Sequence, residues 1–220
     1  MTGLLGLITA ACFAQKGEVN TAQSEYTKYE SLRPNKAMAK LALNSLNTAK
    51  TSIDKASTNE KTANWPLTQA LKGSIYASLA INDTVPATST PLFATAEEAL
   101  KKAKELDTKG ENKKMIDNAG LMLAQYKLNQ GVREYGDKKY DLAYKSFDYY
   151  RSVLPEDTNA IYYTGLAAAN AGNLDAAIAN YSKLVTTNYS AKARAYQELS
   201  GLYLDKKDTA NAIKVMNDAA

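Results

Sequence analysis

The feature that most constrains this fold is a recurring triple of an alanine, a bulky side chain and a third packing residue. Within each triple the residues are spaced by four and then three, which places them on one stripe of an α-helix. The last three triples begin at Ala143, Ala177 and Ala212, which are 34 and 35 residues apart. Two earlier triples have wider intervals. The five triples are Ala42, Leu46, Ala49; Ala96, Leu100, Ala103; Ala143, Phe147, Tyr150; Ala177, Tyr181, Leu184; and Ala212, Met216, Ala219.

Composition favours helices over strands. The chain has 220 residues, of which 36 are alanine, whereas valine and isoleucine together number 14. Sheets favour β-branched side chains, while alanine is the strongest helix former and lets helices approach closely. Gly131 and Gly165 each lie 12 residues before the alanine that opens a triple. We therefore expect a small residue on one helix to receive a bulky residue from the next.

The periodicity predicts ten helices in five antiparallel pairs. Glycines at 136 and 172 mark tight turns, and Pro155 ends a helix because proline cannot donate the next backbone hydrogen bond. Two segments interrupt the repeat, a polar linker at 57–65 and an insertion rich in proline and threonine at 81–91. The expected helices are 17–32, 35–56, 66–80, 92–107, 112–135, 138–154, 158–171, 174–187, 191–205 and 208–219.

One stretch of the chain resembles the tetratricopeptide repeat (TPR) family. The matching residues are Gly131, Tyr135, Tyr140, Ala143, Phe147 and Pro155, and two similar stretches follow. Tyr150 and Tyr189 depart from the family pattern. The resemblance implies an all-α, right-handed TPR superhelix (α-solenoid) of about five helix pairs. It divides the chain into divergent TPR-like pairs at 15–110 and three TPR motifs at 111–220, an array that could continue beyond the last residue.

An apolar run from Leu4 to Phe13 predicts export. Its length suits a secretory signal and is too short to span a bilayer. Cleavage after Ala14 would remove a signal peptide of residues 1–14, and the exported chain resembles exported TPR proteins of Bacteroidetes. We therefore expect a periplasmic or outer-membrane-associated protein. Two alternatives remain: a buried N-terminal helix, and lipidation at Cys12, where Thr9 to Cys12 resembles a lipobox lacking its usual leucine.

Residue chemistry argues against catalysis. The chain has no histidine and one cysteine, which removes histidine-based triads and clusters of thiolate and imidazole metal ligands. It has no glycine-rich phosphate loop and no calcium-type loop. We therefore expect a non-enzymatic protein with no metal and no cofactor. The net charge of +4 is spread evenly, so we expect no nucleic-acid partner, and we expect no membrane span.

The candidate binding residues lie on the helix face that lines the concave groove in TPR arrays. Tyrosine, with 15 copies, offers a large ring with a polar tip that suits recognition. A carboxylate clamp does not fit, because Leu128 and Val132 stand where it needs lysine and asparagine. The expected groove residues are the tyrosines Tyr126, Tyr135 and Tyr162 and the polar residues Asn170, Arg194, Gln197 and Asp205.

These features predict a protein–protein interaction scaffold of the cell envelope that binds a peptide or protein segment in its groove. Two alternatives remain: a TPR lipoprotein in outer-membrane assembly, and a carbohydrate-binding helical protein that stacks sugars on tyrosines and Trp65. The last helix ends at Asp218-Ala219-Ala220 without a glycine cap. Terminal repeats usually need a polar outer face, so we expect either a longer array or docking of this helix onto a partner or, as self-association, onto a second copy.

Overall fold

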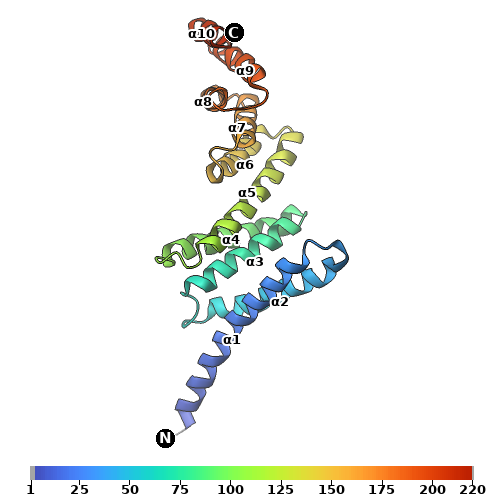
Figure 1. Cartoon of the computed structure of the whole chain (residues 1–220), viewed down its shortest axis with the longest axis vertical. Coiled ribbons are helices and arrows are strands. Elements are labelled where there is room, and N and C mark those ends of the chain that lie inside the picture. Colours follow the sequence, from blue (N-terminus) through green and yellow to red (C-terminus); the bar gives the residue numbers. More distant parts are fainter. Residues whose placement is uncertain (1–2, 220) are drawn as a thin grey trace. The chain divides into compact units, whose positions relative to one another are not determined.

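The expected all-α architecture is confirmed. A computed structural model describes the backbone of residues 3–219 and the side chains of residues 16–219. Within that part of the chain there are ten α-helices, one short 3-10 helix and no strand (Figure 1). The elements are α1 (Gly3–Leu32), η1 (Lys36–Met38), α2 (Ala39–Thr58), α3 (Pro66–Asn82), α4 (Pro86–Leu106), α5 (Lys113–Gly136), α6 (Tyr140–Val153), α7 (Thr158–Asn170), α8 (Leu174–Val185), α9 (Lys192–Asp205) and α10 (Thr209–Asp218).

The chain forms two compact units, an N-terminal unit (Met1–Leu123) and a C-terminal unit (Ala124–Ala220). The division falls inside α5, later in the chain than the boundary at residue 110 expected from the sequence. In the N-terminal unit each helix from α1 to α4 contacts the next. In the C-terminal unit the same holds from α6 to α10. Within each unit the helix pairs therefore stack in chain order, which is the arrangement of an α-solenoid.

The recurring triples form the buried stripes of the second helices. Leu46, Leu100, Phe147 and Tyr181, the bulky members of the first four triples, are each 4% exposed or less. The alanines that accompany them are equally buried. The last triple differs, because Ala212 is buried whereas Met216 is 46% exposed. The repeat pattern thus identifies core positions in four pairs and an apolar face left uncovered on α10.

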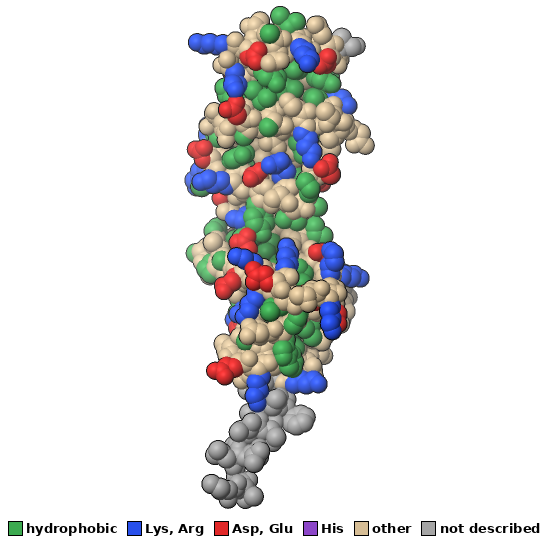
Figure 2. All heavy atoms as spheres, turned by 90° about the vertical axis from the view of Figure 1, so that its left-hand side faces the viewer, with side chains coloured by type: hydrophobic (Ala, Val, Ile, Leu, Met, Phe, Trp, Pro, Cys, Tyr) green, Lys and Arg blue, Asp and Glu red, His purple; other side chains and the backbone are tan. Residues whose placement is uncertain are grey.

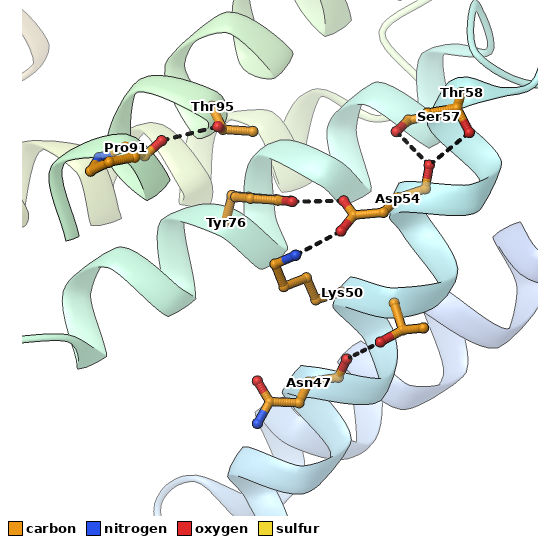
Figure 3. A network of polar contacts seen from close by, with 9 residues as sticks. Asn47, Lys50, Asp54, Ser57, Thr58, Tyr76, Pro91 and Thr95 are labelled. Carbon is orange, nitrogen blue, oxygen red and sulfur yellow. Dashed lines mark hydrogen bonds and ion pairs between the residues drawn. The ribbon is translucent and has the colours of Figure 1, made fainter. Parts of the chain in front are cut away.

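Polar contacts connect the first helix pair of the N-terminal unit, α1 and α2, to the second pair, α3 and α4. Asp54 on α2 accepts a 2.7 Å hydrogen bond from the Tyr76 hydroxyl on α3 and another of 2.7 Å from the Lys50 ammonium (Figure 3). The Lys50 nitrogen also lies 5.2 Å from the centre of the Tyr76 ring. Burial raises the pKa of Tyr76, and the hydrogen bond to Asp54 raises the pKa of Lys50. Tyr76 therefore stays neutral and Lys50 stays charged, which suits a structural contact rather than a proton-transfer site.

Helix α4 begins earlier than the sequence indicated. The segment 81–91 was expected to be an insertion, but α4 starts at Pro86 and runs through Pro91. A proline is well tolerated at the first helical position, where its missing N–H would have no partner within the helix. Just before it, the Asp83 carboxylate accepts a hydrogen bond of 2.9 Å from the Val85 backbone N–H. Pro86 thus marks the start of a helix and not a loop, and Pro91 lies inside that helix.

The expected signal peptide, residues 1–14, and the expected lipidation site at Cys12 fall outside the residues whose side chains are described. The backbone of α1 runs continuously from Gly3, so the cleavage point after Ala14 does not coincide with a helix end. Export therefore stays a prediction. Within the described part of the chain, no helix combines enough length with enough apolar character to cross a bilayer.

Candidate functional site

Close contacts between small and bulky residues fix how the two helices of a pair meet. A Cβ atom added at Gly131 on α5 would lie 2.6 Å from the Phe147 ring on α6. A Cβ added at Gly165 on α7 would lie 3.3 Å from the Tyr181 ring on α8. Gly73 on α3 faces Leu100 on α4 in the same way. In each case the glycine of the first helix receives the bulky member of the triple on the second helix.

The turns within the C-terminal pairs repeat with the same period. Lys138, Gly172 and Lys207 each adopt a left-handed backbone conformation, with φ of 60°, 76° and 60°. They lie 34 and 35 residues apart, which matches the spacing of the triples. In the last pair Ser200 replaces the glycine, and its hydroxyl donates a 3.2 Å hydrogen bond to the Ala212 carbonyl. The turn spacing and the small-to-bulky contacts are those that the resemblance to tetratricopeptide repeats implied for these helix pairs.

The helix pairs leave a hollow between the first helices of two neighbouring pairs, α7 and α9. This α7–α9 hollow has a volume of about 450 Å³. It brings together three of the residues expected from the sequence, namely Asn170 on α7 and Gln197 and Asp205 on α9. Glu198, Gly201 and Leu202 complete its α9 side, and the sequence-based prediction had missed all three. Gln197, Gly201 and Asp205 are spaced by four, so the helical period itself could have indicated Gly201.

The α7–α9 hollow is polar and acidic. Glu198 and Asp205 contribute carboxylates, and Asn170 and Gln197 contribute amides that can both donate and accept hydrogen bonds. Arg194 was also expected in the groove. It is exposed, and its Nε lies 3.6 Å from a carboxylate oxygen of Glu198, one turn further along α9. Arg194 thus flanks the hollow and partly offsets its negative charge.

Tyr135 is connected to the hollow through Asn170. The Asn170 side-chain amide donates a 3.1 Å hydrogen bond to the Tyr135 hydroxyl and one of 2.9 Å to the Leu166 carbonyl. The Tyr135 ring packs edge-on against Tyr140, with ring centres 5.2 Å apart. Burial raises the pKa of Tyr135, so its hydroxyl stays protonated at neutral pH. Tyr135 therefore holds the Asn170 amide in place and links α5 to α7.

Tyr162 belongs to an aromatic cluster rather than to the lining of the α7–α9 hollow. Its ring stacks on Tyr189, with centres 5.7 Å apart, and meets Tyr181 edge-on at 6.4 Å and Tyr163 at 5.5 Å. Tyr181 and Tyr189 both come from outside α7. The residue spacing within a single helix therefore could not show that they would pack against Tyr162. Tyr162 thus packs against the core of the α7–α9 repeats.

The assignment of Tyr126 to an open groove is wrong, because its side chain is only 4% exposed. Ala119, Leu123 and Tyr126 are all buried and are spaced by four and three along α5. This is the same spacing that marks the buried stripes of the other helices, so the sequence carried the signal that Tyr126 is a core residue.

The described side chains provide no evident site for metal chemistry. Among residues 16–219, no group of three or more His, Cys, Asp and Glu side chains is arranged to hold a metal ion. On the face shown in Figure 2, acidic and basic side chains are interspersed within each part of the chain. The surface in that view therefore carries no continuous field of one sign.

Comparison with known proteins gives similar structures but no similar sequence. No protein-family model matches the chain, and no curated protein matches it. Among solved structures, MamA from Desulfovibrio magneticus RS-1 is 18% identical and covers 90% of this chain and 93% of its own, with a TM-score of 0.39. A tetratricopeptide repeat protein from Parabacteroides merdae is 15% identical and covers 90% of this chain and 78% of its own, with a TM-score of 0.34.

Proposed function

We propose that this chain is a non-enzymatic protein-binding scaffold of the cell envelope, and that the α7–α9 hollow takes a peptide or protein segment. The observation that carries the proposal is the convergence of Asn170, Gln197, Glu198 and Asp205 on one hollow between the first helices of adjacent TPR pairs. The Gln197 amide can pair with both the N–H and the C=O groups of an extended backbone. Asn170 donates its two amide hydrogens to Tyr135 and Leu166, so it offers its side-chain carbonyl oxygen as an acceptor. The two carboxylates favour a segment with a basic side chain or a free amino group.

The composition of the hollow favours a peptide over a carbohydrate. Sugar binding would use the open face of an aromatic ring as a stacking platform. The residues that line the α7–α9 hollow include no aromatic side chain. Tyr162, one of the tyrosines expected to serve, already stacks on Tyr189, and Tyr135 packs edge-on against Tyr140. Trp65 is 38% exposed but belongs to the N-terminal unit.

Site-specific crosslinking in cells tests the binding proposal. A photo-crosslinking amino acid at Gln197, which lines the hollow, should capture a defined partner segment that mass spectrometry can identify. The matched control places the same crosslinker at Lys145, an exposed residue of α6. Charge reversal by Asp205→Lys should abolish the crosslink from position 197. Identical products from both positions, or products indifferent to Asp205→Lys, would show that the hollow is not the binding site.

The envelope location rests on the N-terminal sequence, and intact-protein mass spectrometry tests it. Cleavage after Ala14 would give a mature chain that begins at Gln15. A chain that begins at a lipid-modified Cys12 would support the alternative of a tethered lipoprotein in outer-membrane assembly. A chain that retains residues 1–14 unmodified, recovered from the cytoplasmic fraction, would contradict export while leaving the binding proposal intact.

A further inference from the structure

A second hollow lies within the N-terminal unit, where the sequence indicated no binding residue. This N-terminal hollow has a volume of about 360 Å³ and lies among α1, α3 and the first turns of α5. Its residues on α1 include Tyr26 and Glu30, and its residues on α3 are Leu67 and Ser74. Pockets that hold ligands begin at about 300 Å³, so this volume suits one or two side chains of a bound segment.

The floor of the N-terminal hollow is uncharged and already hydrogen-bonded. Tyr26 is 4% exposed, and its hydroxyl lies 3.1 Å from the Ser78 hydroxyl on α3. Ser74 is 1% exposed and donates a 2.9 Å hydrogen bond to the Ala70 carbonyl. Burial raises the pKa of Tyr26 above the usual value for tyrosine, so its hydroxyl stays protonated at neutral pH. Because its polar groups have partners, the floor does not require a polar group from the ligand.

The walls are apolar and adaptable. Leu67, Met115 and Met122 line the hollow, and all three are half-buried. The Met122 sulfur accepts a 3.5 Å hydrogen bond from the Ser78 hydroxyl, and this bond orients the Met122 side chain. Methionine is unbranched and polarizable, so paired methionines can close around apolar side chains of different shape. The space between Met115 and Met122 therefore suits an aliphatic or aromatic side chain.

The rim is charged, with two carboxylates against one ammonium group. Glu30 on α1 and Glu111 before α5 carry the negative charges, and Lys114 carries the positive one. All three are exposed, and none forms an ion pair with another described residue. Arg33 is near enough to influence Tyr26 but does not line the hollow. The net charge of the lining thus favours a cationic group beside the apolar side chain.

We propose that the N-terminal hollow is a second docking site, which takes a segment of a partner protein that carries an apolar side chain next to a lysine or arginine. The apolar side chain lies between Met115 and Met122, and the basic side chain lies against Glu30 and Glu111. This inference rests on the proposed protein-binding function, but it concerns different residues in a different unit. Two sites of this kind on one chain would let weak individual contacts combine through their effective concentration.

Peptide display on the full-length chain tests this inference. A library of short random peptides is selected on the wild-type chain, and each recovered peptide is then measured by fluorescence anisotropy against three variants. Met115→Glu places a charge in the apolar wall, Glu30→Lys reverses the rim, and Asp205→Lys alters only the α7–α9 hollow. We expect a class of peptides with an apolar residue beside Lys or Arg that loses about tenfold or more in affinity with Met115→Glu and keeps it with Asp205→Lys.

The charge reversal guards against a folding artefact. Glu30 is exposed, so Glu30→Lys should leave thermal stability unchanged while it weakens the binding of selected peptides that carry Lys or Arg beside the apolar residue. If no selected peptide depends on Met115, or if dependent peptides ignore Glu30→Lys, the inference is overturned. Peptides that depend on Asp205 alone would support the α7–α9 hollow and still overturn this second site.

Discussion

A Cβ atom at Gly131 would lie 2.6 Å from Cε1 of Phe147, nearer than carbon atoms of two side chains can approach. Phe147 is 2% exposed, so its ring has no free space into which to move. The absence of a side chain at position 131 therefore sets the distance between α5 and α6. The same relationship holds between Gly73 and Leu100 in the N-terminal unit.

Gly131→Ala should therefore destabilise the C-terminal unit. The gain in helix propensity is about 1 kcal/mol, whereas overpacking costs about 1–3 kcal/mol, so we expect a net loss of about 1 kcal/mol. Urea unfolding followed by circular dichroism measures it. Gly201→Ala, in α9 of the same unit, is the matched control, because an added Cβ there meets no atom within 4 Å. It should leave stability unchanged or increase it by up to about 1 kcal/mol; a loss as large as that of Gly131→Ala would contradict the packing argument.

The left-handed turn residues predict the opposite effect on stability: a glycine introduced there should stabilise the C-terminal unit. Lys138 and Lys207 have φ of 60°, a conformation that costs a residue with a Cβ about 1 kcal/mol relative to glycine. Lys138→Gly should therefore raise the unfolding midpoint of the C-terminal unit, because relief of this strain outweighs the conformational entropy that glycine adds to the unfolded chain. The reverse change, Gly172→Ala at φ of 76°, should lower it. If both variants moved the midpoint in the same direction, these turns would not carry the strain assigned to them.

Much of the fold could be predicted because it depends on spacing within one helix. The interval from Ala143 to Phe147 identified a buried stripe, and the glycine at 131 identified the surface that receives it. Turn geometry was harder. Gly136 was expected to make the turn, but Lys138 has the positive φ. The packing of the two helices fixes the position at which the chain must reverse direction. That position, rather than the nearby glycine, decides which residue adopts the left-handed conformation.

The candidate sites were predictable in part for the same reason. Asn170, Gln197 and Asp205 share a hollow because helical period places residues on a face. Period alone does not show what covers that face. Tyr162 is packed against Tyr189. Tyr189 lies in the segment before α9, and only the tertiary fold brings it next to Tyr162. The N-terminal hollow combines residues from three helices with no common interval between them, so no sequence pattern marked it.

The stack of Tyr162 on Tyr189 leads to a prediction about stability. Tyr162→Ala should lower the stability of the C-terminal unit by about 2 kcal/mol, because a half-buried ring and its contacts with Tyr181 and Tyr189 are lost. Tyr162→Phe keeps the ring and should remain within about 0.5 kcal/mol of the wild type. Helicity at low temperature should be intact in both, so thermal unfolding and near-ultraviolet circular dichroism are the informative measurements. Equal effects of the two substitutions would show that the hydroxyl, not the ring, matters.

Buried tyrosines predict a loss of stability at alkaline pH. Burial raises the pKa of Tyr26 in the N-terminal unit and of Tyr181 in the C-terminal unit well above the value of about 10 in unfolded chains. The native state therefore holds these protons more tightly than the unfolded state. Their contribution to stability is complete below pH of about 10 and declines as pH rises above it, because only the unfolded chain can then ionise freely. Thermal midpoints measured across this range, with tyrosinate absorbance as the readout of ionisation, should fall together with the onset of ionisation.

Single substitutions assign this alkaline transition to particular rings. Tyr181→Phe removes one ionisable group from a ring that is 1% exposed, so the C-terminal unit should lose less stability between neutral and alkaline pH than in the wild type. Tyr26→Phe should do the same for the N-terminal unit. It should also lower stability at neutral pH by about 1 kcal/mol, because Ser78 loses its hydrogen-bond partner on α1. A wild-type slope in the Tyr181→Phe variant would mean that the decline at high pH comes from other groups of the C-terminal unit, such as Tyr150, whose pKa is also raised by burial.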